Sequence, residues 1–67
     1  MTIEQLKAKT QYGDYTTLGA ILNLSPPTAK MRFLRGDQEA KEALELIIET
    51  REKLIEEFKL KTDQHEN

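Results

Sequence analysis

The sequence predicts an all-α fold of three short helices followed by one long C-terminal helix. Its apolar residues are mainly Leu, Ile and Ala, with no Val and no Trp, and that composition favours helix over sheet. These residues recur at intervals of three and four, the period of a helix with one buried face. From Asp37 to about Leu60 the chain contains neither Gly nor Pro, so nothing interrupts a long helix there.

Length and composition narrow the class of protein. A chain of 67 residues forms one domain at most and lies near the lower size limit for folding alone. The absence of Cys excludes disulfides and thiolate metal sites, and it fits a reducing compartment. No apolar run approaches the ~18 residues that span a membrane, and the N-terminus lacks the pattern of a signal peptide. We therefore expect one cytoplasmic helical domain, residues 1–60, for which a partner chain supplies additional stability.

The first helix begins with a capping signal. Thr2 and Gln5 have the spacing of a capping box, in which each side chain bonds the backbone N–H of the other residue. Leu6 is an apolar contact of this short helix, which ends near Thr10. Residues 11–14 contain turn formers and predict a loop.

The second and third helices are separated by a short turn. Asp14 or Thr16 is expected to cap the second helix, residues 15–22. Asn23 suits the turn because Asn tolerates the left-handed conformation in which many helices end. Ser25 is the expected cap of the third helix, residues 26–35, whose first position is a proline.

Gly36 ends the third helix, and Asp37 is expected to cap the fourth, residues 38–60. Residues 61–67 are polar and are expected to form a disordered tail.

Residues 15–36 have the layout of a helix-turn-helix. Gly19, in the first helix of the pair, lets the second helix cross at close range, and Ala29 and Phe33 share one face of that second helix. The segment resembles the helix-turn-helix of small bacterial and phage DNA-binding proteins of the Cro/repressor-like and recombinase- or excisionase-like groups. The residues that carry the resemblance are Leu18-Gly19, Leu22-Asn23-Leu24-Ser25, Thr28-Ala29, Phe33 and Arg35-Gly36.

The resemblance implies that helix 26–35 is a recognition helix that enters the major groove of double-stranded DNA. Met31 is an apolar residue on a face expected to be wet, which fits contact with a thymine methyl group. Hydroxyls and backbone N–H groups at the start of the preceding helix suit phosphates. The expected DNA-binding residues are Thr16, Thr17, Ser25, Pro27, Thr28, Lys30, Met31, Arg32 and Arg35.

The charge distribution is consistent with this interpretation. The net charge of −2 combines +3 in residues 1–36 with −5 in residues 37–67, an asymmetry that suggests two halves with different roles. One alternative is that Arg32 or Arg35 merely pairs with Glu39 or Glu42 on the surface. Met31 has an alternative role as an ordinary core residue.

The long helix predicts a homodimer. At about 35 Å it outruns a 36-residue domain of roughly 20–25 Å, yet its apolar stripe continues, interrupted by one arginine. We expect residues 40–47 to pack on the rest of the chain and a second copy to cover the remainder. The expected dimerisation residues are Ile48, Arg51, Leu54, Ile55 and Phe58. The alternative is that this part folds back, so that Ile3 and Leu6 cover Leu54 and Phe58.

The sequence gives no sign of catalysis. The only His is His65, in the polar tail, and the only Ser is Ser25, which a helix cap explains. No catalytic residue, metal site, cofactor or small-molecule ligand is therefore expected, and the protein is not expected to be an enzyme. The expected function is a phage-like or mobile-element transcriptional regulator. The alternative is a protein-interaction module, like an antitoxin or an adaptor subunit, that binds a partner through the apolar stripe of helix 48–58.

Overall fold

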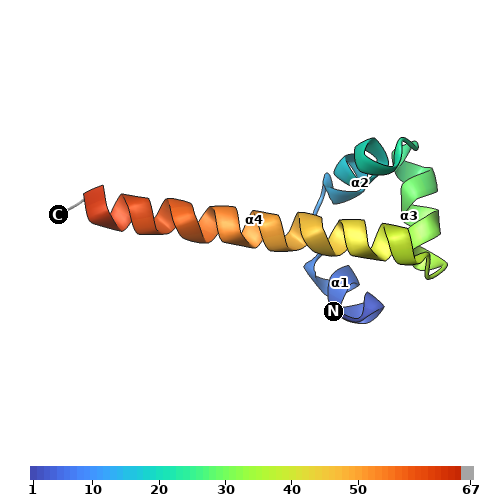
Figure 1. Ribbon diagram of the computed structural model, residues 1–67, viewed down its shortest axis with the longest axis horizontal. Coiled ribbons are helices and arrows are strands. Elements are labelled where there is room, and N and C mark those ends of the chain that lie inside the picture. The colour runs from blue at the N-terminus through green and yellow to red at the C-terminus, as the bar shows by residue number, and fades with distance from the viewer. Residues whose placement is uncertain (66–67) are drawn as a thin grey trace.

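The computed structural model describes the backbone of residues 1–65 and the side chains of residues 1–61. All regular structure in this part of the chain is helical, which confirms the predicted all-α fold of three short helices and one long C-terminal helix. The elements are α1 (Ile3–Lys9), α2 (Asp14–Leu22), α3 (Pro26–Leu34) and α4 (Gln38–His65) (Figure 1). Within the described residues, no helix combines the length and the apolar character needed to cross a membrane.

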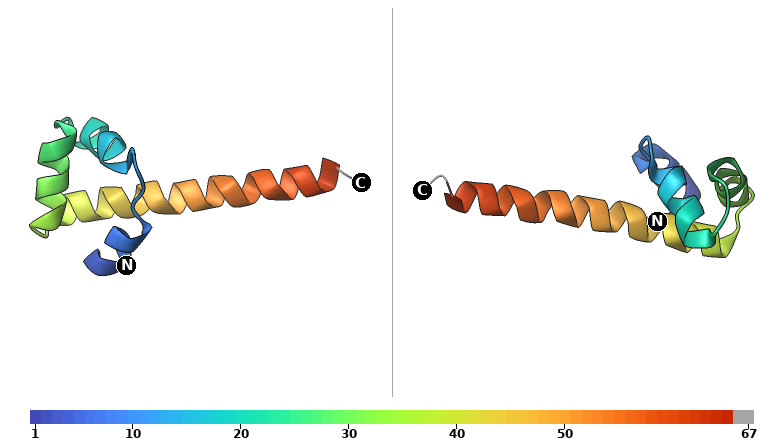
Figure 2. Two further views of the ribbon diagram at one scale, coloured as in Figure 1. Left: turned by 180° about the vertical axis from the view of Figure 1, so that it is seen from behind. Right: turned by 90° about the horizontal axis from the view of Figure 1, so that it is seen from above.

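The three short helices gather around the N-terminal half of α4. In Figure 1, α2 and α3 lie on one side of α4 and α1 lies on the other, while the C-terminal half of α4 extends away from them. In the two further views, the C-terminal half of α4 also extends away from the other three helices (Figure 2). The chain therefore measures 48 × 22 × 17 Å, with α4 along its longest axis.

Local signals in the sequence account for most helix ends. The Thr2–Gln5 capping box is present at the start of α1, and the N–H of Ala40 donates to Asp37 Oδ1 at 3.1 Å at the start of α4. The residue after α2, Asn23, adopts the predicted left-handed conformation, with φ of 60°.

The start of α2 differs from the prediction. Neither Asp14 nor Thr16 caps the helix, because the cap position is Gly13, with φ of 94° and no side chain to bond the backbone. Glycine adopts this conformation without a steric penalty. Asp14 lies inside the first turn, where it accepts a hydrogen bond from the N–H of Gln11 at 2.7 Å.

The core draws on all four helices. Its fully buried apolar residues are Leu6, Leu18, Ala29, Phe33, Ala40, Leu44 and Ile48. Ala40 and Leu44 confirm that the first turns of α4 pack on the rest of the chain. Ile48 was expected to need a second chain, and that prediction is wrong because its side chain is fully buried in this core.

The helix α4 is longer than predicted. It continues to His65, so residues 61–65 are helical and not the expected disordered tail, whereas residues 66–67 lie outside the described part. The sequence offers no Gly or Pro to stop the helix. The alternative in which this segment folds back onto α1 is also wrong, because Leu54 and Phe58 are 66% and 68% exposed. We call residues 53–61, which extend beyond the core, the overhang.

Candidate nucleic-acid interface

The turn between α2 and α3 is fixed by close backbone packing at Gly19. A Cβ atom added to Gly19 would lie 2.5 Å from the carbonyl oxygen of Leu24 and 3.3 Å from the nitrogen of Pro26. The N–H of Leu24 also donates to the carbonyl of Gly19 at 2.8 Å. Only a residue without a side chain allows this approach, so Gly19 sets the position of α3 relative to α2.

The helix α3 has one buried and one exposed face. Ala29 and Phe33 are fully buried and hold the helix against the core. Met31 is 50% exposed, so it does not serve as a core residue. The other predicted DNA-binding residues on α3 and its cap are also exposed, apart from the half-buried Arg32: Ser25, Pro27, Thr28, Lys30 and Arg35. The predicted residues of this group thus share the outer side of one helix.

The start of α3 differs in one detail from the prediction. Ser25 occupies the cap position, but its side chain makes no capping hydrogen bond. The Ser25 hydroxyl instead donates to the Thr28 hydroxyl at 2.8 Å, and both groups are exposed. The backbone N–H groups of the first turn of α3 are therefore left without a side-chain partner from Ser25.

Aromatic contacts hold Lys30 at the junction of α2 and α3. Its ammonium nitrogen lies 5.5 Å from the centre of the Tyr15 ring, a cation–π distance. The Tyr15 ring in turn lies 6.4 Å from the Phe33 ring at 47°. Tyr15 comes from α2, so this contact restrains Lys30 without neutralising its charge. Sequence reasoning missed the pair, for which the spacing of the two residues gave no signal.

Arg32 is the predicted DNA-binding residue with a partner inside the chain. Its guanidinium donates to Asp37 Oδ2 at 2.6 Å and 3.0 Å and lies 3.8 Å from Glu39. The backbone N–H of Ala40 and the Arg32 guanidinium hold the pKa of the Asp37 carboxyl below its ordinary value. Arg32 therefore forms a surface ion pair, as the alternative interpretation expected. Its charge is largely compensated within the chain itself.

Arg35 and Thr16 remain available to a ligand, whereas Thr17 is engaged. Among the described residues, no ion pair or side-chain hydrogen bond engages Arg35, which is exposed at the end of α3. Thr16 and Thr17 are exposed in the first turn of α2, where the Thr17 hydroxyl donates to the carbonyl of Gly13 at 3.3 Å.

Residues 15–36 contain Lys30, Arg32 and Arg35 but no Asp and no Glu. The acids that border this segment are both paired: Asp14 is buried and bonded to Arg51, and Asp37 is bonded to Arg32. The charges of Lys30 and Arg35 are therefore the ones left to act on a ligand. A ligand that approaches the outer side of α3 therefore meets a positive surface.

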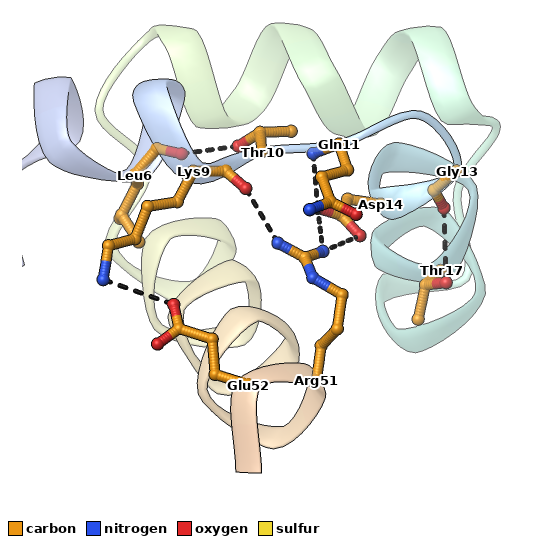
Figure 3. A network of polar contacts seen from close by, with 9 residues as sticks. All are labelled: Leu6, Lys9, Thr10, Gln11, Gly13, Asp14, Thr17, Arg51 and Glu52. Atoms are coloured by element: carbon orange, nitrogen blue, oxygen red, sulfur yellow. Dashed lines mark hydrogen bonds and ion pairs between the residues drawn. The ribbon is translucent and has the colours of Figure 1, made fainter. Parts of the chain in front are cut away.

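The predicted dimerisation residues divide into two groups. Leu54, Ile55 and Phe58 are exposed on the overhang, whereas Ile48 belongs to the core. Arg51 is 22% exposed and joins α4 to the last residue of α1, Lys9, and to the first residue of α2, Asp14, as Figure 3 shows.

The contacts of Arg51 explain why a cation interrupts the apolar stripe. Its Nη1 donates to both carboxylate oxygens of Asp14 at 2.5 Å, and its Nη2 donates to the carbonyl of Lys9 at 2.7 Å (Figure 3). Next to it, Lys9 pairs with Glu52 at 3.2 Å. The interruption of the stripe was the only sequence signal for this contact.

Comparison with models of known protein families, with curated proteins and with solved structures finds no match for this chain. In the part of the chain that the structure describes, no group of three or more His, Cys, Asp or Glu residues is arranged to hold a metal ion.

Proposed function

We propose that this protein binds double-stranded DNA in a sequence-specific manner, with α3 as its recognition helix. The observation that carries the proposal is the exposed face of α3, which combines cations with an exposed Met31 on a segment without a carboxylate. An exposed Met beside cations suits a major groove in which base methyl groups alternate with hydrogen-bond acceptors.

Each residue of this face has a distinct expected contact. Lys30 and Met31 lie at the middle of α3, next to the N-terminal half that reaches base edges in helix-turn-helix complexes. Arg35, at the far end of the helix, is placed to meet a phosphate. Thr16, in the first turn of α2, offers its hydroxyl and backbone N–H to a second phosphate. Thr17 lies beside it, but its hydroxyl and its N–H both donate to the carbonyl of Gly13.

The proposal assigns Arg32 a smaller share of the binding than the other cations. Its guanidinium already pairs with Asp37, so a phosphate must compete with that carboxylate. In this account the protein acts as a homodimer and as a transcriptional regulator of the phage or mobile-element type.

A double variant tests the proposed recognition helix. Replacing Lys30 and Arg35 together by Ala is expected to weaken binding to duplex DNA at least tenfold, because each cation contributes contacts worth about 1–3 kcal/mol at a base or releases counterions at a phosphate. The slope of log affinity against log salt is expected to become shallower by about 0.9, because Arg35 is the cation of the two that is placed at a phosphate. Fluorescence anisotropy between 50 and 200 mM salt, on the order of the range over which such binding changes, measures both quantities.

The matched control removes two cations elsewhere. Lys7 lies on α1 and Lys53 on the overhang, and both side chains are exposed. The Lys7→Ala/Lys53→Ala variant has the same net charge as the test variant, so it shows the effect of charge alone. Equal loss of affinity in the two double variants would contradict the assignment of α3.

A second candidate function is a protein-interaction module. The observation that favours it is the exposure of Leu54, Ile55 and Phe58 on a helix that extends beyond the core. A folded protein that binds no duplex DNA at low salt, but binds another protein through these residues, would support this function over the first.

A further inference from the structure

An apolar groove runs along α4 on the side that faces α2. Ile21 of α2 and Leu46, Ile47, Thr50 and Leu54 of α4 line most of it, and its volume is about 370 Å³. Ile21 is 52% and Leu46 61% exposed. The groove therefore has apolar walls from two helices and opens directly to the outside.

The groove continues onto the overhang. A second hollow of about 340 Å³ is lined by Leu54, Glu57, Phe58 and Lys61, so the two hollows share Leu54. Leu54 lies four residues after Thr50 in the groove and four residues before Phe58 on the overhang. Along α4, the apolar groove therefore lies before Leu54 and the exposed ring of Phe58 lies after it.

We infer that the groove receives the overhang of a second copy of this chain, with the two α4 helices antiparallel and crossing near Leu54. A two-fold axis there brings Phe58 of each copy beside Thr50 of the other, so that the ring faces the wall formed by Ile21. The contact is isologous, because the same surface serves as receptor and as ligand in both chains.

The charges of α4 favour this orientation. Residues 38–52 contain five acidic and two basic residues, a net charge of −3, and residues 53–61 contain two acidic and three basic residues, a net charge of +1. With the axis at Leu54, residues 53–61 of each copy lie alongside residues 47–55 of the other. Lys59 then lies opposite Glu49 and Glu57 opposite Arg51, while Glu52 and Glu56 form the one like-charged pair. Parallel pairing would place the two −3 segments side by side, which is unfavourable at low ionic strength.

The small size of the chain is a second reason to expect that another copy of it fills the groove. The described residues include only seven fully buried apolar side chains, and a chain of 67 residues is near the limit for a self-sufficient core. Pairing through the groove would bury Ile21, Leu46 and Leu54 in both copies. This inference concerns the assembly of the chain and does not depend on whether the protein binds DNA.

Sedimentation equilibrium of the full chain tests the pairing. The wild-type protein is expected to show a dimer that dissociates on dilution. Leu54→Asn is expected to raise the dimer dissociation constant at least tenfold, because it places an amide at the centre of the contact. Leu60→Asn is the matched control, since Leu60 is 58% exposed on the same helix but lines neither hollow.

Two results would overturn the inference at this stage. One is a wild-type protein that stays monomeric at millimolar concentration, which would leave the groove to a different protein. The other is an equal effect of Leu54→Asn and Leu60→Asn, which would show that the contact does not use the groove. Circular dichroism of each variant confirms that the helical fold is retained.

A spin label at Glu42 distinguishes the two orientations. Glu42 is exposed and lies twelve residues before Leu54, and the chain has no Cys, so Glu42→Cys gives a single labelling site. In the antiparallel pair the two labels are expected about 36 Å apart along the helix axis, at 1.5 Å per residue. A distance near the ~8–10 Å separation of neighbouring helices would show a parallel pair and overturn the proposed orientation.

Discussion

Replacing Gly19 with Ala is expected to lower the free energy of unfolding by about 3 kcal/mol, the upper part of the range for overpacking a tight contact. The added Cβ would lie 2.5 Å from the carbonyl oxygen of Leu24, which belongs to the backbone and cannot rotate away. α2 and α3 must then separate, and the hydrogen bond from the N–H of Leu24 to Gly19 is strained. A chain of this size has roughly 3–10 kcal/mol of total stability, so the change removes a large share of it.

Helix propensity and close packing predict opposite effects of Gly19→Ala on the free energy of unfolding, so the direction of the measured change distinguishes them. Propensity alone predicts that Gly→Ala within a helix raises stability by about 1 kcal/mol. The adjacent residue Ala20 is exposed, and Ala20→Gly is expected to lower stability by about 1 kcal/mol through propensity alone. Urea unfolding of both variants measures the difference, and a Gly19→Ala variant more stable than the wild type would contradict the close packing of the turn.

Replacing Arg51 with Leu is expected to lower the free energy of unfolding by about 2 kcal/mol, between the values for an exposed and a fully buried ion pair, because Asp14 is buried while Arg51 is 22% exposed. Asp14 would be left buried without its cation, and the carbonyl of Lys9 would lose a donor. The loss also removes the contacts of α4 with the end of α1 and the start of α2. Thermal or urea unfolding monitored by circular dichroism measures the effect.

The control for Arg51 is a neighbouring exposed cation. Lys53→Leu removes the same charge two residues further along α4 and is expected to change stability by less than about 0.5 kcal/mol. The double variant Asp14→Asn/Arg51→Leu is expected to lose less than the sum of its single variants, because the buried charge is then removed with its partner. An Arg51→Leu variant as stable as Lys53→Leu would show that the contact contributes nothing.

The elements predicted correctly are those whose signals are local. The capping box at Thr2, the left-handed turn at Asn23 and the cap at Asp37 each depend on a few neighbouring residues, so the sequence displays them directly. The close approach at Gly19 was also predictable, because a helix-turn-helix layout requires a small residue at that position. The exposed face of α3 follows from helical periodicity once Ala29 and Phe33 are assigned to the core.

The contacts missed in the sequence connect distant residues. Arg51 looked like a defect in an apolar stripe because its partner, Asp14, is 37 residues away. Ile48 was assigned to a dimer because the length of the core was estimated from a compact 36-residue domain. In the structure, Lys9 at the end of α1 pairs with Glu52 of α4. The short helices therefore cover α4 further along its length than a compact 36-residue domain would, and Ile48 lies within the covered part.

Selection of bound duplexes from a random DNA pool tests the central claim, sequence-specific binding through α3, most directly. The folded wild-type protein is expected to enrich one short motif over successive rounds, and Lys30→Ala/Arg35→Ala is expected to lose that enrichment. A pool that remains random at low salt, with the wild-type protein folded, would contradict the proposed function.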